Sequence, residues 1–310
     1  MRTRKLGGAG PEISVTGYGA WQAGGAHWGE PMPDDDVIAA IQAAIDSGQT
    51  WIDTAEVYGQ GRSEELVGRA IAGRRDDVLV FTKVAPDDEG SGIRPDEIRS
   101  AIQRSLRRLG TDHVDLYQVH WPDERIPVEE TWGAMAELVG EGLTRRIGVS
   151  NFDRALVERC LPIHPVASVQ NELSLVCQDD TSELLPWLAG QGIGYLAYSP
   201  LASGLLTGRI AAGETFAEDD WRRHEFTPDR LADAVPRVER LAAIAERLEL
   251  TTADLALAWV LHQPGVTGAI CGTLSAANAR RNSAAGGIEL DPAVVAEAGE
   301  LFTSGAGRPA

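Results

Sequence analysis

Six short apolar runs in this 310-residue sequence each end in a polar residue, and a tyrosine follows the first of them closely. The six residues are Asp53, Lys83, His120, Asn151, Gln170 and Tyr198, and the additional tyrosine is Tyr58. General acid–base chemistry uses a phenol, an amine, a carboxylate or an imidazole. If the fold brings Asp53, Tyr58, Lys83 and His120 together, the set suits reduction of a carbonyl group, because hydride addition makes an alkoxide that needs a proton donor.

These four side chains would have distinct roles in such a reaction. A free tyrosine titrates near about 10 and a neighbouring ammonium lowers that value, so Lys83 is expected to lower the pKa of Tyr58. Burial favours loss of the Lys83 proton, and an ion pair with Asp53 opposes that loss. His120 is expected to bind the substrate oxygen or to assist the proton transfer.

Lysine is rare in this chain, which makes Lys83 informative. Of the 28 basic residues only Lys5 and Lys83 are lysine, and the others are arginine. Arginine stays protonated and is not a compact point charge. A lysine kept at the end of an apolar run therefore indicates that its own chemistry is required there.

The apolar runs alternate with amphipathic stretches, which is typical of βα units on a parallel sheet. Eight runs begin near residues 14, 50, 78, 114, 146, 166, 194 and 266, and residues 94–110 and 127–142 have the apolar spacing of helices. This order predicts an α/β fold, a closed (β/α)8 TIM barrel forming one domain over residues 1–310, with an N-terminal β-hairpin at its lower end. Such a barrel gathers the carboxyl ends of its strands on one face, and residues 199–229 are expected to form a long loop over that face.

The composition is that of a globular protein, with 43% hydrophobic and 24% charged residues. The formal net charge of −18 argues against a nucleic-acid partner, because a phosphate backbone would be repelled. The three cysteines form no CxxC motif, and neither a long apolar stretch nor a signal-type N-terminus is present. We therefore expect a cytoplasmic protein without a membrane partner, and its oligomeric state remains open.

Six motifs of the chain resemble, in order and spacing, those of the aldo-keto reductase family. They are Asp53-Thr-Ala-Glu-Val-Tyr-Gly, Thr82-Lys83, His120-Trp121-Pro122, Gly148-Val-Ser-Asn-Phe, Gln170-Asn-Glu and Ala197-Tyr-Ser-Pro-Leu-Ala-Ser-Gly-Leu-Leu-Thr-Gly. The resemblance implies reversible, NADPH-dependent reduction of a small-molecule aldehyde or ketone on a (β/α)8 barrel. Tyr58 matches the proton donor of the family, and Asp53, Lys83 and His120 match its supporting residues.

The resemblance also implies a set of cofactor-binding residues. Ser150, Asn151 and Gln170 match the side chains that hold the nicotinamide carboxamide, and Tyr198 matches the ring that stacks on the nicotinamide. The segment along the pyrophosphate contains Ser199, Leu201, Ser203, Gly204 and Leu205, and the adenosine end contains Gly272, Thr273, Asn278 and Asn282.

The adenosine end departs from the family pattern. Cys271 stands where many members have Pro, Leu274 stands at an often basic position, and Arg281 replaces the Glu before Asn282. A 2′-phosphate needs a cation or several donors, and Arg280 or Arg281 could supply one. NADPH is thus the expected cofactor, and NADH is not excluded.

Four tryptophans follow strands or lie in the long loop and could line an apolar substrate cleft: Trp21, Trp28, Trp121 and Trp221. Of these, Trp21 and Trp121 are the preferred substrate-binding residues. Small aldehydes, sugars, keto acids and dicarbonyls all remain possible substrates.

Other functions fit parts of this pattern. A nucleotide-sensing regulatory binding protein could use the same barrel with marginal turnover. A metal-dependent lyase is disfavoured because the six histidines include no HxH or HExxH spacing. A Rossmann fingerprint is also missing, since neither glycine pair, at 17 and 19 or at 59 and 61, has the third glycine.

Overall fold

Eight parallel strands form a closed barrel in the computed structural model, which describes residues 1–25, 28, 32–86 and 93–303. The strands are β3 (Thr16–Gly19), β4 (Trp51–Asp53), β5 (Leu79–Val84), β6 (Leu116–Val119), β7 (Ile147–Ser150), β8 (Ser168–Glu172), β9 (Gly194–Tyr198) and β10 (Val266–Gly272). They pair in chain order, and β10 closes the barrel against β3. The predicted (β/α)8 barrel is confirmed.

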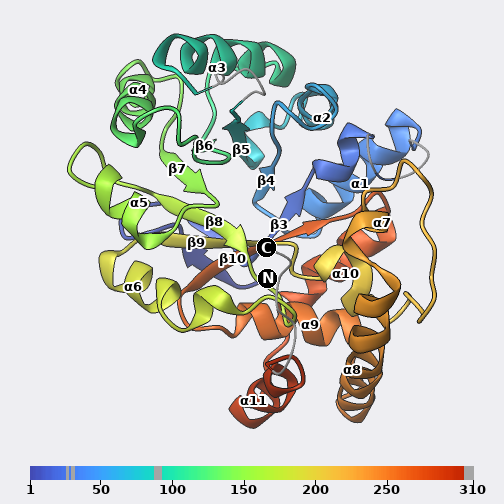
Figure 1. Ribbon diagram of the computed structural model, residues 1–310. Coiled ribbons are helices and arrows are strands. Elements are labelled where there is room, and N and C mark those ends of the chain that lie inside the picture. Colours follow the sequence, from blue (N-terminus) through green and yellow to red (C-terminus); the bar gives the residue numbers. More distant parts are fainter. Residues whose placement is uncertain (26–27, 29–31, 87–92, 304–310) are drawn as a thin grey trace.

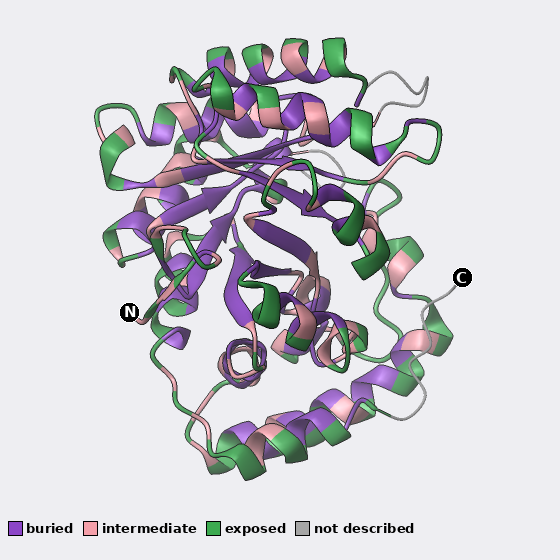
Figure 2. Ribbon diagram, turned by 90° about the vertical axis from the view of Figure 1, so that its left-hand side faces the viewer, coloured by how far each residue is buried: buried purple, intermediate pink, exposed green. Residues whose placement is uncertain are grey.

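Helices surround the barrel and join successive strands (Figure 1). They are α1 (Asp34–Asp46), α2 (Arg62–Ala70), α3 (Pro95–Leu109), α4 (Val128–Gly140), α5 (Arg154–Cys160), α6 (Leu184–Gln191), α7 (Arg222–Glu225), α8 (Pro228–Arg247), α9 (Thr252–Leu261), α10 (Ala276–Ala285) and α11 (Pro292–Glu300). Figure 2 shows buried residues on the strands and on the inner sides of these helices, and exposed residues on the outer sides.

The local sequence explains where α3 begins and ends. Pro95 occupies the first turn, followed by two acidic residues that favour a helix N-terminus, and Gly110 ends the helix with φ 65°. Between them, Ile98, Ile102 and Leu106 are buried at the three- and four-residue spacing of one helix face.

The segment over the mouth is more regular than the predicted long loop. A 3-10 helix covers Ala202–Thr207, the short helix α7 follows, and α8 already begins at Pro228. The side chain of Thr227 caps α8 by accepting a hydrogen bond from the backbone N–H of Arg230.

A layer of large apolar side chains fills the lower part of the barrel. Its members are Leu6, Ile13, Trp51, Phe81, Leu116, Leu196 and Ile270. Two of them belong to the N-terminal hairpin of β1 (Thr3–Lys5) and β2 (Glu12–Ser14): Leu6 directly follows β1, and Ile13 lies within β2. The hairpin therefore closes this end, as expected. The ring of Trp51 stacks on Phe81 at 5.1 Å between centroids. A Cβ atom on Gly17 would lie 2.2 Å from the Trp51 ring, which explains a glycine there.

The same layer determines where the polar residues point. Side chains two positions apart on a strand face the same side. Asp53, Lys83 and Gln118 stand two residues after Trp51, Phe81 and Leu116. They therefore face the barrel interior, directly above the apolar layer.

Replacing Trp51 by alanine is expected to lower the free energy of unfolding by about 3–5 kcal/mol, because the indole is fully enclosed and its loss leaves a cavity. Denaturant unfolding followed by circular dichroism would measure this. The matched control is Trp187→Ala on α6, where the side chain is partly exposed and a smaller loss is expected. Equal losses in the two variants would contradict the prediction.

Candidate active site

The four predicted catalytic side chains meet at the carboxyl ends of β4, β5 and β6. The Lys83 Nζ atom lies 2.5 Å from Asp53 Oδ1 and donates a second hydrogen bond to the Thr54 carbonyl at 2.9 Å. It also lies 3.5 Å from the Tyr58 hydroxyl oxygen. Lys83 is fully buried, so the ammonium is enclosed by the groups that it contacts.

The loop that carries Tyr58 is held tightly against the rest of the mouth. The hydroxyls of Thr54 and Ser63 hydrogen-bond at 2.8 Å, and Ser63 Oγ also donates to the Ala20 carbonyl. Gly59 follows Tyr58 with φ 60°, and a Cβ atom there would lie 2.1 Å from the Gly24 carbonyl oxygen. Only glycine fits this close approach, and the turn fixes the direction of the tyrosine.

His120 completes the group. Its ring lies 5.6 Å from the Tyr58 ring, nearly perpendicular to it, and 3.7 Å from the Trp121 ring in a stacked arrangement. The Nδ1 atom is buried without a hydrogen-bond partner among the described residues. Burial, aided by the Lys83 charge, holds the pKa of His120 well below its usual value, so the imidazole is neutral near pH 7.

The pKa of the phenol differs from the sequence prediction. Burial, with a smaller effect of the Asp53 charge, raises the pKa of Tyr58 well above its ordinary value. The predicted net lowering of this pKa is therefore wrong, because burial and the Asp53 charge outweigh the stabilisation of the phenolate by the Lys83 ammonium. Burial lowers the pKa of Lys83 and Asp53 opposes this, as predicted. Tyr58 is thus a neutral phenol at neutral pH, which is the form that can donate a proton.

Two amides hold the second oxygen of Asp53. Gln170 Nε2 donates to Asp53 Oδ2 at 2.8 Å, and Gln118 Nε2 lies 3.3 Å from the same atom. Sequence reasoning missed Gln118. The available signal was an amide inside an apolar strand, two residues before His120 and hence on the same face.

Three of the predicted nicotinamide-binding side chains form a hydrogen-bonded row beside this group. Asn151 Oδ1 accepts a bond from the Tyr198 hydroxyl at 2.7 Å, and Asn151 Nδ2 donates to the His120 carbonyl at 2.9 Å. Ser150 Oγ donates to the Gln170 carbonyl at 2.7 Å. Asn151, Ser199 and Ser203 have φ between 51° and 60°, a left-handed conformation that is uncommon outside glycine and concentrates at functional sites.

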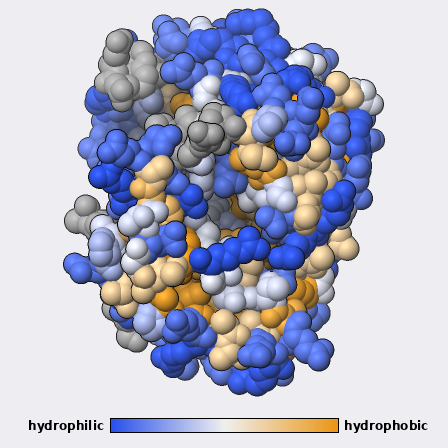
Figure 3. All heavy atoms as spheres, turned by 90° about the vertical axis from the view of Figure 1, so that its right-hand side faces the viewer, coloured by the Kyte–Doolittle hydropathy of each residue, from blue (hydrophilic) through white to orange (hydrophobic). Residues whose placement is uncertain are grey.

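A cavity of about 1980 Å³ opens above these residues. It is lined by every predicted cofactor-binding residue, by Trp21 and Trp121, and by Asp53, Tyr58 and His120, whereas Lys83 lies beneath its floor. Small-ligand sites usually occupy about 300–1,000 Å³, so this cavity has room for a dinucleotide and a substrate together. The face in Figure 3 is hollowed near its centre, with hydrophobic residues beside the hollow.

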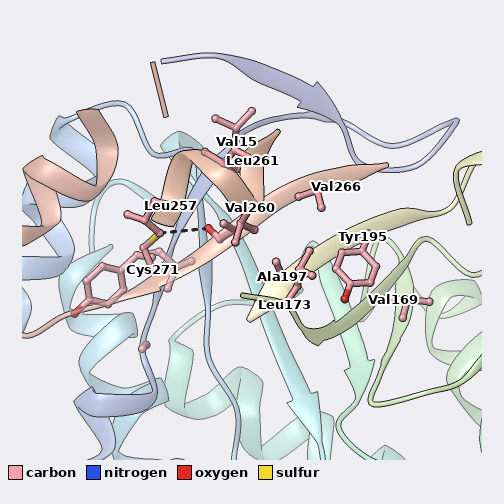
Figure 4. Packing of buried hydrophobic residues seen from close by; sticks show 14 of the residues in the cluster. Val15, Val169, Leu173, Tyr195, Ala197, Leu257, Val260, Leu261, Val266 and Cys271 are labelled. Atoms are coloured by element: carbon pink, nitrogen blue, oxygen red, sulfur yellow. Dashed lines mark hydrogen bonds between the residues drawn. The ribbon is translucent and has the colours of Figure 1, made fainter. Parts of the chain in front are cut away.

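The outer part of the cavity contains the predicted adenosine end. Thr273 and Asn282 are mostly buried, and Arg281 of α10 lines the cavity with no carboxylate within ion-pair distance in the described ranges. Arg280 is not among the described residues that line the cavity. Cys271 packs beside Leu257 of α9 (Figure 4), and burial raises the pKa of its thiol to about 12, so this cysteine is a core residue.

The donor set suits a nicotinamide dinucleotide. Amide groups stand at the deep end beside Tyr58, hydroxyl and backbone groups of residues 199–205 follow, and a guanidinium lies at the outer end. Outside the undescribed segments, no three His, Cys, Asp or Glu side chains group closely enough to hold a metal ion. No helix in the described parts of the chain is long and apolar enough to cross a membrane.

A closed parallel barrel with a tyrosine, a lysine, an aspartate and a histidine grouped at its carboxyl rim is the arrangement expected for an enzyme that protonates a carbonyl oxygen during its reduction. The family described as "Aldo/keto reductase family" matches residues 16–301, so the chain belongs to the aldo/keto reductases. Members of this family reduce carbonyl compounds.

Individual relatives agree with this assignment. Aldo-keto reductase YhdN of Bacillus subtilis is 38% identical over 281 residues, which cover 88% of this chain and 85% of that protein. The glycerol dehydrogenase AKR11B4 from Gluconobacter oxydans has a TM-score of 0.85 at 32% identity, covering 97% of this chain and 94% of that one. An aldo-keto reductase from Klebsiella pneumoniae, solved in complex with NADPH, has a TM-score of 0.79 at 32% identity. The match covers 97% of this chain and 96% of that one.

Proposed function

We propose that this protein reduces an aldehyde or ketone to the alcohol, reversibly, with NADPH as cofactor and Tyr58 as the proton donor. The observation that carries the proposal is the Tyr58 hydroxyl, 3.5 Å from a buried lysine that is itself paired with Asp53, below a cavity lined by the predicted cofactor-binding residues. The NADPH complex of the Klebsiella pneumoniae relative supports the choice of cofactor.

NADPH supplies the hydride when it is bound. In this chain, Ser150 and Asn151 would hold its carboxamide, and the Tyr198 ring would support the nicotinamide. Gln170 already donates to Asp53, so its main contribution would be to orient that carboxylate. Arg281 would face the 2′-phosphate.

The proton transfer follows from the environment of Tyr58. Its high pKa keeps the proton on the oxygen until an alkoxide develops beside it. The Lys83 ammonium then stabilises the phenolate, and Asp53 keeps Lys83 charged against the effect of burial. Neutral His120 can hydrogen-bond the carbonyl oxygen without adding a second positive charge.

The absorbance of NADPH, followed with the purified protein and a panel of aldehydes, tests the proposal. Oxidation of NADPH that requires both protein and aldehyde is the expected result. Tight binding of NADPH without turnover on any aldehyde would contradict an enzyme and favour the nucleotide-sensing alternative.

Arg281→Ala is expected to raise the Kd for NADPH about 10- to 100-fold, the scale of a hydrogen bond to a charged group, and to leave the Kd for NADH unchanged. Fluorescence titration with both cofactors would measure this. Arg280→Ala is the matched control and should change neither Kd. Equal weakening of NADPH and NADH binding by Arg281→Ala would show that the guanidinium does not contact the 2′-phosphate.

The pH profile of the reduction follows from two pKa shifts. The pKa of Tyr58 is raised, so the donor stays protonated through neutral pH, and the pKa of His120 is lowered, so the imidazole stays neutral. We expect kcat/KM to be flat from about pH 6 to about pH 9 and to fall only at more alkaline pH. The check is to measure kcat/KM across this pH range with an aldehyde that has no titrating group. A pH profile of kcat/KM with its midpoint near pH 7 would contradict the prediction.

A further inference from the structure

A buried ion pair lies behind the catalytic group, on the outer side of β5. The carboxylate of Glu64, in the first turn of α2, is fully buried, and its Oε1 atom accepts a hydrogen bond from the Thr82 hydroxyl at 2.6 Å. The Nε and Nη2 atoms of Arg108, in the last turn of α3, both lie 2.6 Å from its Oε2 atom. Thr82 directly precedes Lys83, so the pair contacts β5 from the side opposite to the ammonium.

Arg108 also contacts the turn that carries Tyr58. A Cβ atom on Gly61 would lie 2.5 Å from both Cδ and Nε of Arg108, so this side chain packs directly on the turn. Its Nη2 atom lies 3.9 Å from Glu56 Oε2, within ion-pair distance. Glu56 comes shortly before Tyr58 in the chain, and Glu64 comes shortly after it. One guanidinium therefore binds the turn on both sides of the tyrosine.

The backbone between these two carboxylates is closed by its own hydrogen bonds. The Tyr58 N–H donates to the Ala55 carbonyl at 3.2 Å, and the Ser63 N–H donates to the Tyr58 carbonyl at 3.2 Å. A displacement of Glu56 or Glu64 would therefore be passed on to Tyr58 rather than absorbed by the segment between them.

The distance that these contacts control joins the Tyr58 hydroxyl to Lys83 Nζ. It is 3.5 Å, longer than an ordinary hydrogen bond, so little further separation is tolerable. Lys83 belongs to β5 and Tyr58 to the turn, and the pair of Glu64 and Arg108 contacts both. Misplacing a reacting group by about 1 Å can reduce a rate about 100-fold.

We propose that Arg108 is a positioning residue for the reaction, which holds the Tyr58 turn against β5 and so keeps the Tyr58 hydroxyl beside Lys83. This inference rests on the proposed function, in which Tyr58 is the proton donor. Arg108 is not among the described residues that line the cavity, so it acts on the chemistry only through Tyr58. The expected effect of disturbing it is a loss of kcat without a change in cofactor affinity.

Arg108→Lys separates positioning from charge balance. A lysine keeps a positive charge beside the buried Glu64 carboxylate, so the fold should persist, but its ammonium lacks the planar fork that covers Gly61 and reaches both carboxylates. We expect kcat to fall about tenfold, with KM for the aldehyde and Kd for NADPH within about twofold of wild type. Arg107→Lys, at the exposed neighbouring position of α3, is the matched control and should change none of these values.

Denaturant unfolding of the same preparations would show that the fold persists. Wild-type kcat in Arg108→Lys would mean that only the charge is needed, and it would overturn the inference. The double variant Glu64→Gln with Arg108→Met removes both buried charges and gives a second comparison, in which the same loss of kcat is expected. Wild-type kcat in this double variant would also overturn the inference.

A double-mutant cycle shows whether the effect passes through the tyrosine oxygen. Tyr58→Phe combined with Arg108→Lys should be about as slow as Tyr58→Phe alone, because the position of a missing hydroxyl has no further effect on the rate. If the two losses multiplied instead, Arg108 would act independently of Tyr58 and the inference would be wrong.

Hydrogen exchange measured by mass spectrometry tests the positioning without turnover. In Arg108→Lys, amide exchange should accelerate about tenfold or more in the peptide covering residues 55–64 and stay at the wild-type rate in β8 and β9. Unchanged exchange over residues 55–64 would overturn the inference and leave the proposed function intact. If the wild-type protein reduced no carbonyl compound, the proposed function would fail, while faster exchange over residues 55–64 would still show that Arg108 holds this turn.

Discussion

Tyr58→Phe is expected to reduce the rate of carbonyl reduction about 100-fold or more, the usual scale for removing a general acid, and to leave NADPH binding unchanged. The substitution removes one oxygen atom, the one that lies 3.5 Å from Lys83 Nζ, and keeps the ring that packs near His120 and Trp21. Single-turnover rates and a fluorescence titration with NADPH would separate the loss of chemistry from any loss of binding.

Tyr117→Phe provides the matched control for this substitution. Unlike Tyr58, which is only partly buried and lines the cavity, Tyr117 is fully buried, and its hydroxyl has no hydrogen-bond partner among the described residues. Its removal should leave the reduction rate within about a factor of two of wild type, since no proton passes through it. If the two variants lost comparable amounts of reduction rate, the phenol hydroxyl would matter only for packing. Tyr58 would then not be the proton donor.

Lys83→Met is expected to be at least as damaging as Tyr58→Phe, since it removes the charge that stabilises the phenolate. It also leaves the Asp53 carboxylate buried without its cation, and breaking such a pair costs about 3–5 kcal/mol of stability. Lys83→Arg should not restore activity, because the larger planar guanidinium does not fit a site that encloses the lysine fully. Rates and denaturant unfolding on the same preparations would measure both effects.

A double variant separates the stability effect from the catalytic one. Asp53→Asn with Lys83→Met removes both charges, so most of the stability lost in Lys83→Met should return. The reduction rate should stay low, because the phenolate still lacks a neighbouring cation. Recovery of the rate together with the stability would show that Lys83 acts only as a structural residue.

The barrel and the clustering of Asp53, Lys83 and His120 were predictable because both depend on repeated local patterns. Apolar runs alternate with amphipathic helices along the whole chain, and a parallel barrel brings all strand ends to one face. Asp53, Lys83 and His120 therefore had to be neighbours once the strands were placed. The hairpin at the lower end followed from the same order of elements.

The sequence could not predict properties that depend on the full three-dimensional environment. The pKa of Tyr58 is raised because burial and Asp53 outweigh Lys83, and a list of neighbours does not tell how deeply a phenol is enclosed. Similarly, Gln118 and Gln170 share one oxygen of Asp53 from two strands, which only the register of the barrel reveals. Trp21 and Trp221 meet across 200 positions of the chain, and no periodicity connects them.

Strand β4 has only three residues, and two of them, Trp51 and Asp53, have different roles. Trp51 fills the lower layer of the barrel, and Asp53 holds the ammonium of Lys83. Inserting or deleting one residue between them would turn one of the two side chains outward, so fold and catalysis would fail together. Trp21, Trp121 and Trp221 line the cavity from connecting segments, so substitutions at these positions leave the shared strand unchanged.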